Sequence, residues 1–271
     1  MTTATPTKKE RRDQARQERI AREQAEAAWT ARRRRFTRLG AVLGAAAVVV
    51  VILVAVSSSG GGSASTSSSA SSSAVAGTQA SRSLLNGIPQ KGLTLGNANA
   101  PVRVLEFADL QCPFCAQYST QVLPTLVEKY VKTGKVKMEL RLIPILGEDS
   151  RTAANWAAAA ALQNKTWQFS EAFFADQGQE GSGYVNEDFL TSVAEQVDGL
   201  NVDEVKEQQG SEEAGAIVNQ STRQASTAGV SGTPTFRIGR TNQTLEALEI
   251  TALEAAQFEQ QIDRLLGQGG G

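Results

Sequence analysis

The chain has 271 residues, 41% of them apolar, and a formal net charge of -1, which is enough for one sizeable core with appendages. It contains two cysteines and no histidine, so a structural zinc site, which needs four ligands, is excluded. The charge is uneven, because residues 1–38 hold 12 basic and 5 acidic residues, against 15 and 23 in the rest. The two parts are therefore expected to face different surroundings.

Residues 39–56 are 18 consecutive residues without a charge, about the minimum for a transmembrane helix. Five arginines precede this segment, which predicts a cytoplasmic N-terminus and an extracytoplasmic remainder: Arg32, Arg33, Arg34, Arg35 and Arg38. A cleaved signal peptide is the competing interpretation, and the long basic region disfavours it.

The segments on either side of the predicted span differ in composition. The basic region 1–38 is expected to associate with anionic lipid headgroups, and nucleic acid is a less favoured partner because membrane proximity already explains the charge. Residues 57–83 are mostly Ser, Gly and Ala, the composition of a flexible tether. The folded domain is then expected at 84–271.

The folded part begins with a strand, a helix and a second strand. Val102–Phe107 is an apolar run typical of a buried strand. A helix is predicted from Cys112 to about Val131, with Pro113 in its first turn and a kink at Pro124. Apolar and charged residues then alternate over 136–142, which predicts a strand.

Helical patterns dominate the segment from about 150 to 228, with N-caps predicted at Ser150, Thr166, Asn186, Asn201 and Ser211. Strand character returns at 235–238 with a probable partner at 245–250, and an amphipathic helix is predicted over 252–266. This order predicts an α/β sandwich interrupted by a helical insertion.

Both cysteines lie in the motif Cys112-Pro113-Phe114-Cys115. Haem attachment is excluded because Ala116, and not His, follows the second cysteine. A structural disulfide would close a loop of two residues and stabilise weakly. A redox pair fits better: the unpaired N–H groups at the helix start favour the Cys112 thiolate, and Cys115, one turn further on, would resolve the mixed disulfide.

Two further positions are candidates. Glu106 is an acid among apolar strand residues; burial would raise its pKa and allow it to exchange a proton with Cys115, whereas an edge-facing Glu with access to water is the alternative. Pro234 follows Thr233 at the start of a strand, one of the few positions in a sheet that tolerate proline.

Together these residues resemble the DsbA-type thiol-disulfide oxidoreductases, in particular membrane-anchored thioredoxin-like proteins of the bacterial cell envelope, over about residues 88–268. The resemblance implies a thioredoxin fold with a helical insertion at about 150–228. It implies Cys112 as nucleophile, Cys115 as resolving thiol and Glu106 as buried acid. It also implies a cis Thr233–Pro234 bond whose preceding backbone pairs with an extended substrate.

Phe114 departs from the best-known oxidase of this family, which carries His at this position. An imidazolium would help to hold the thiolate, so Phe114 predicts a less oxidising pair. An alternative role for Phe114 is to widen the apolar surface offered to unfolded clients.

The expected function is that of an extracytoplasmic oxidase that introduces disulfides into reduced exported proteins. No metal or cofactor is expected, so reoxidation is assigned to a quinone-linked membrane protein. A reductase or isomerase of the same fold, and a tethered peptide-binding chaperone without redox turnover, are the alternatives.

Overall fold

The structure of the protein is a computed structural model that describes residues 84–267. The basic region 1–38, the apolar segment 39–56 and the tether 57–83 lie outside the described residues and remain predictions. Within residues 84–267, no helix combines the length and the apolar character needed to cross a bilayer.

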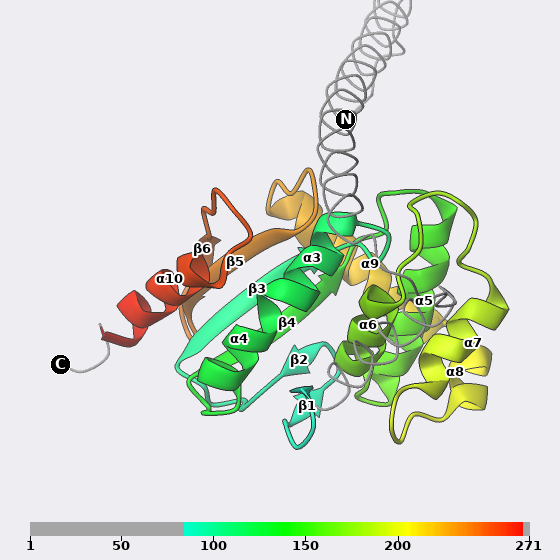
Figure 1. Cartoon of the computed structure of the whole chain (residues 1–271), viewed down its shortest axis with the longest axis horizontal. Helices are drawn as coiled ribbons and strands as arrows, with labels where there is room; N and C mark the ends of the chain where they lie inside the picture. Colours follow the sequence, from blue (N-terminus) through cyan, green and yellow to red (C-terminus); the bar gives the residue numbers. More distant parts are fainter. Residues whose placement is uncertain (1–83, 268–271) are drawn as a thin grey trace, which may run out of the picture. The chain divides into compact units, whose positions relative to one another are not determined.

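A mixed sheet with the strand order β1-β2-β4-β3-β5-β6 forms the centre of the domain (Figure 1). The central strand β3 (Val102–Ala108) runs parallel to β4 (Val136–Leu142) and antiparallel to β5 (Thr235–Arg240). These three strands confirm the sequence prediction: β3 is buried on both faces, as its apolar run predicts, and β4 and β5 bury apolar residues at alternate positions.

The edges of the sheet differ from the prediction. An unpredicted hairpin of β1 (Gln90–Lys91) and β2 (Thr94–Leu95) extends the sheet beyond β4. At the other edge β6 is limited to Glu246–Ala247, shorter than the predicted strand at 245–250. Strands of two residues are too short for a periodic pattern to reveal them.

The helix after β3 is interrupted, as its proline predicts. It consists of α3 (Pro113–Gln121), α4 (Leu123–Leu126) and a π-helical turn η1 (Val127–Val131). The break lies at Val122, with φ -110° and ψ -51°, two residues before Pro124. Proline has no N–H to donate to the preceding turn and crowds it, so a continuous helix is disfavoured there.

Five helices form the predicted insertion between β4 and β5: α5 (Glu148–Leu162), α6 (Thr166–Ala175), α7 (Glu187–Glu195), α8 (Val202–Gln208) and α9 (Glu212–Thr227). The side chains of Asn186, Asn201 and Ser211 cap α7, α8 and α9 as predicted.

The predicted caps of the first two insertion helices are wrong. Helix α5 starts at Glu148 after Gly147, whose φ of 103° suits glycine, so Ser150 lies within the helix and is buried. Thr166 is the first residue of α6, and the N-cap position is Lys165.

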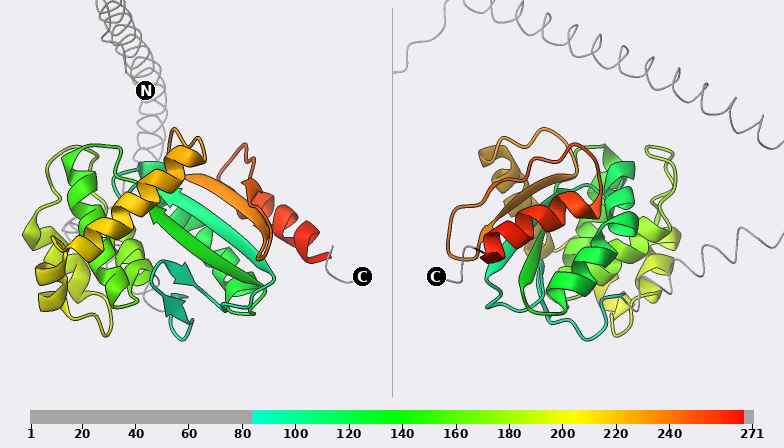
Figure 2. Two further views of the ribbon diagram at one scale, coloured as in Figure 1. Left: turned by 180° about the vertical axis from the view of Figure 1, so that it is seen from behind. Right: turned by 60° about the vertical axis from the view of Figure 1, so that its left-hand side comes forward.

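The sheet is covered unequally on its two faces. Helices α3, α4 and α10 (Ala255–Gly267) cover one face, and α9 crosses the other (Figure 2). Along β3, Val104, Glu106 and Ala108 face the first group, whereas Leu105 and Phe107 pack with Ala225 of α9. Glu106 therefore points toward the helix that carries the cysteines.

Candidate active site: a dithiol at the start of α3

The turn that joins β3 to α3 is fixed by a buried aspartate. Asp109 accepts hydrogen bonds from the backbone N–H of Gln111 (2.9 Å) through one carboxylate oxygen, and from Ile145 (2.8 Å) and Leu146 (3.0 Å) through the other. This places Cys112 at the N-cap of α3, with Pro113 as the first helical residue.

The Cys112 thiol is close to the segment before β5. It is buried, 5% exposed, and its Sγ lies 3.2 Å from the carbonyl oxygen of Thr233, to which the protonated thiol donates a hydrogen bond. The Thr233–Pro234 peptide bond is cis. The structure thus brings together the two sequence motifs, 121 residues apart.

The pKa of Cys112 is lowered from the ordinary thiol value to about 6. The largest cause is hydrogen bonding with the Cys115 side chain, and burial, the next cause, acts in the opposite direction. The Thr233 side chain and backbone hydrogen bonds to Cys115 and Phe114 at the helix start lower it further. At neutral pH Cys112 is therefore mainly a thiolate.

Cys115 has the opposite character. It is completely buried, and burial raises its pKa well above the ordinary value. Hydrogen bonding and charge at Cys112, and the charge of Glu106, act in the same direction, whereas a backbone hydrogen bond to Asp109 opposes them. Both cysteines are free thiols, so the site is a dithiol with one reactive sulfur and one that keeps its proton.

Glu106 is buried, 3% exposed, which confirms the predicted burial and rules out the edge-facing alternative. Its neighbours across the sheet are Leu140 and Phe236. Burial raises its pKa well above the ordinary value, and the charges of Glu171 and Cys112 raise it further. Within residues 84–267, its Oε1 atom has no hydrogen-bond partner.

Sequence reasoning missed a clamp that the helical insertion places on the active-site turn. Gln177 donates from Nε2 to the carbonyls of Leu110 (2.6 Å) and Cys112 (3.3 Å). Gln111 donates to the hydroxyl of Tyr184 (2.8 Å) and accepts from the backbone of Gly181 (3.2 Å). These are glutamines in a loop, and no pattern in the sequence singles them out.

Apolar surface is present beside the reactive thiol. Phe114 is 52% exposed and Ile145 is 49% exposed. Phe114 follows Cys112 by two residues, and the backbone of Ile145 is bound to Asp109 in the same turn. An apolar side chain from each of two segments therefore faces solvent around the active-site turn.

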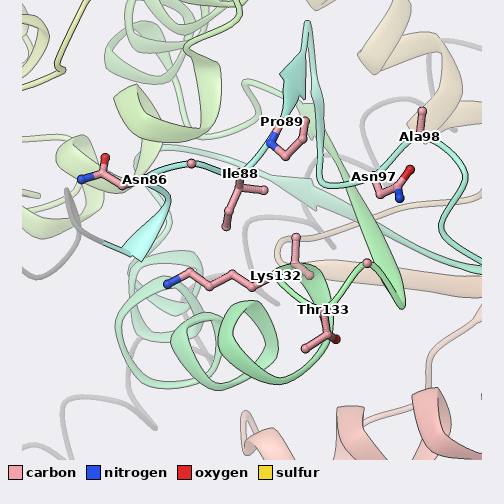
Figure 3. Close-up of a pocket in the computed structure, with 10 residues that line it drawn as sticks. Asn86, Ile88, Pro89, Asn97, Ala98, Lys132 and Thr133 are labelled. Carbon is pink, nitrogen blue, oxygen red and sulfur yellow. The ribbon is translucent and has the colours of Figure 1, made fainter.

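A cavity of about 600 Å³ lies elsewhere, at the amino ends of β3 and β4. Figure 3 shows Asn86, Ile88, Pro89 and Asn97 opposite Lys132 and Thr133, which follow η1. None of its lining residues is a cysteine or an acid. Across the described part of the chain, no three Cys, Asp or Glu side chains gather as metal ligands would.

Comparisons with known proteins agree with this geometry. A family described as Thioredoxin matches residues 89–264. A protein of Bacillus cereus named probable disulfide bond formation protein D is 31% identical over 148 residues, which are 54% of this chain and 68% of that protein.

Solved structures show the same fold. Wolbachia pipientis alpha-DsbA1 is 26% identical with a TM-score of 0.56, over 69% of this chain and 96% of that one. Oxidised BdbD of Bacillus subtilis has a TM-score of 0.57 at 22% identity, over 66% of this chain and 97% of that one. The chain belongs to the thioredoxin family, among its DsbA-like protein-disulfide oxidoreductases.

Proposed function

We propose that the protein is a disulfide-forming oxidase that acts outside the cytoplasm on reduced exported proteins through the Cys112–Cys115 pair. The observation that carries the proposal is the placement of two thiols at the start of α3, with Cys112 at the N-cap against the carbonyl of Thr233 and Cys115 completely buried one turn further on. This placement agrees with a lowered pKa for Cys112 and a raised pKa for Cys115. A thiolate stabilised in the dithiol form makes the corresponding disulfide a better oxidant.

In the proposed reaction a client thiolate attacks Cys112 of the enzyme disulfide. The bond between the two enzyme sulfurs breaks, and Cys115 leaves as a thiolate that takes a proton from Glu106. A second client thiolate then attacks the client sulfur of the mixed disulfide. The client gains a disulfide, Cys112 leaves as a stabilised thiolate, and the enzyme gains two electrons.

Thr233 and Pro234 are assigned to substrate binding, because they lie against Cys112 at the start of β5. An extended client segment could pair there with the backbone before the proline. Pro113 begins the helix, and Phe114 with Ile145 supplies exposed apolar surface for unfolded chains. Phe114 also remains the basis for predicting a weaker oxidant than a protein with His at this position.

The location and partners are proposed on other grounds. The relative in Bacillus cereus is named for disulfide bond formation, a reaction that proceeds in oxidising compartments and rarely in the cytosol. We assign residues 39–56 as a single membrane anchor with the N-terminus inside. Reoxidation is assigned to a quinone-linked membrane protein. A reductase or isomerase would instead need electrons from the cytoplasm.

Refolding of a reduced, disulfide-dependent client by the full-length protein tests the proposal. The oxidised protein should form the client's disulfides stoichiometrically, and Cys112→Ser should be inactive. Cys115→Ala cannot form the enzyme disulfide and should not oxidise the client. Its Cys112 thiolate should instead attack client disulfides and hold them as covalent mixed disulfides, because no Cys115 thiolate is present to release the client. Full client folding with Cys112→Ser would establish a chaperone in place of an oxidase.

The direction of the reaction is tested in cells. Thiol labelling of the protein after acid quenching should find mostly the disulfide form. A mostly dithiol population would show that the protein works as a reductase or isomerase.

A further inference from the structure

A second buried carboxylic acid lies behind the cysteine helix, contributed by the helical insertion. Glu171 of α6 is 4% exposed, and its Oε2 accepts a hydrogen bond from the hydroxyl of Ser119 at 2.6 Å. Ser119 lies on α3, one helical turn beyond Cys115. The carboxyl group of Glu171 is therefore held against the back of the active-site helix.

The charge of Glu171 is coupled to two other buried ionisable groups. The others are Glu106 of β3 and Tyr118 of α3, whose hydroxyl has no partner within residues 84–267. The charge of Glu171 raises the pKa of both. The other helices packed on α6 bury no ionisable side chain against it, because the buried residues of α5 and α7 are alanine, apolar residues and a serine.

Burying a carboxyl group without a cation is costly, so an apolar side chain would be the expected residue if α6 served packing alone. Burial raises the pKa of Glu171 to about 8, with the Ser119 hydrogen bond opposing the increase. When Glu171 ionises, its like charge makes loss of the Glu106 proton harder. Two interacting acids of this kind titrate as a pair.

We propose that Glu171 is a positioning residue of the redox site, whose carboxyl group, held by Ser119, acts through Glu106 to set the pH at which Cys115 exchanges its proton. The inference rests on the proposed function of the two cysteines. In the oxidising direction Glu106 donates its proton to the departing Cys115 thiolate. In the reverse direction the Glu106 carboxylate takes the proton from Cys115 before that sulfur attacks the mixed disulfide.

The test is a single-turnover measurement on the full-length protein carrying glutathione as a mixed disulfide on Cys112. Release of glutathione by Cys115 is followed from pH 5 to pH 10. Glu171→Gln keeps the size and hydrogen-bonding capacity of the side chain but removes the charge, so the midpoint of the rate profile should fall by about one pH unit. Glu171→Asp, which restores a carboxyl group, should move it back toward the wild-type value.

Ser170→Ala is the matched control. Ser170 is the neighbouring buried residue of α6, and its hydroxyl has no hydrogen-bond partner in the described part of the protein. This variant should leave the profile unchanged. An unchanged profile for Glu171→Gln would overturn the inference, as would an equal change for Ser170→Ala.

Failure of the inference and failure of the proposed function give different results. If wild-type protein releases no glutathione, the proposed redox function fails. If wild-type protein releases glutathione and Glu171→Gln has the same pH profile, only the inference about Glu171 fails. Carboxyl carbon NMR on unmutated protein gives a readout independent of variant folding. Glu171 should titrate well above the ordinary range for a glutamate, and titration near pH 4.5 would also overturn the inference.

Discussion

The two ends of strand β3 differ in the side chains that surround them. The carboxyl end leads to Cys112 and is surrounded by side chains from β5, α3 and the insertion. The amino end borders the cavity of about 600 Å³, whose lining contains one charged side chain, that of Lys132, which pairs with Glu128. The carboxyl end has converging ionisable groups, whereas the amino end has empty volume.

The reactive groups of the domain lie at the carboxyl end of β3. A cavity is a common indicator of a binding site, yet the buried thiols and carboxyl groups with shifted pKa values lie at the other end of β3, where side chains fill the space: Cys112, Cys115, Glu106 and Glu171. Charge interactions are stronger where side chains are buried, so the ionisation of each thiol or carboxyl group shifts the pKa of its neighbours. The comparison predicts that substitutions at the carboxyl end alter exchange chemistry and that substitutions at the amino end leave it intact.

The largest effect among supporting residues is expected for Glu106→Gln. Loss of the proton-exchanging group should slow resolution by Cys115 at least about a hundredfold, while the initial reaction of Cys112 persists. Stopped-flow release of glutathione from the mixed disulfide measures this step.

Glu139→Gln is the control for removing a buried acid. Glu139 lies on the neighbouring strand but pairs with Arg103 and Arg141 away from the cysteines. Glu139→Gln should lower the free energy of unfolding without slowing the release of glutathione by Cys115. Equal slowing by both variants would remove the distinction between the site and the rest of the sheet.

A smaller effect is expected for Thr233→Val, which removes the hydroxyl and keeps the backbone carbonyl next to Cys112. Loss of one hydrogen-bonding group should raise the titration midpoint of Cys112 by on the order of half a pH unit. The pH dependence of alkylation reports it. Thr235→Val is the control, because that hydroxyl donates to Gly232; a midpoint that moves equally in both variants would argue against a role for Thr233.

Gln177→Ala tests the clamp between the insertion and the active-site turn. Loss of two hydrogen bonds to buried carbonyls should lower the free energy of unfolding by about 1–2 kcal/mol, measured by urea denaturation. Gln163→Ala removes a comparable exposed pair of bonds to Asn201 and should cost less. A larger loss of unfolding free energy for Gln163→Ala than for Gln177→Ala would show that the clamp contributes little to stability.

The smallest effect is expected at the cavity. Lys132→Ala should leave the rate of dithiol-disulfide exchange within about twofold of wild type, because a charge near the far end of β3 is screened from the cysteines. An exchange rate more than about twofold below that of wild type would show that the amino end also affects the cysteines.

Local patterns in the sequence account for the central strands and the cysteine helix. Strand β3 and the kink near Pro124 follow from apolar periodicity and from the backbone limits of proline. The hairpin of β1 and β2 has no such pattern. Helix α5 begins at Glu148, after Gly147, which adopts a positive φ. The cap predicted at Ser150 was wrong because it considered the side chain of the serine and not the backbone conformation of the glycine.

Long-range contacts account for what the sequence could not reveal at the site. Glu106 and the cysteines are six to nine residues apart, so their relation was predictable from one strand and one helix. Glu171 meets Ser119 across 52 residues, and Gln177 meets Leu110 across 67. Such partners depend on how the insertion packs against α3, which no local pattern determines.

Ultraviolet absorbance of the Cys112 thiolate against pH, in the reduced full-length protein with Cys112→Ser as the blank, tests the central claim most directly. The midpoint should lie at about pH 6, with the thiolate dominant at pH 7 and lost as the pH falls through 6. A midpoint near 9, the ordinary thiol value, would contradict it.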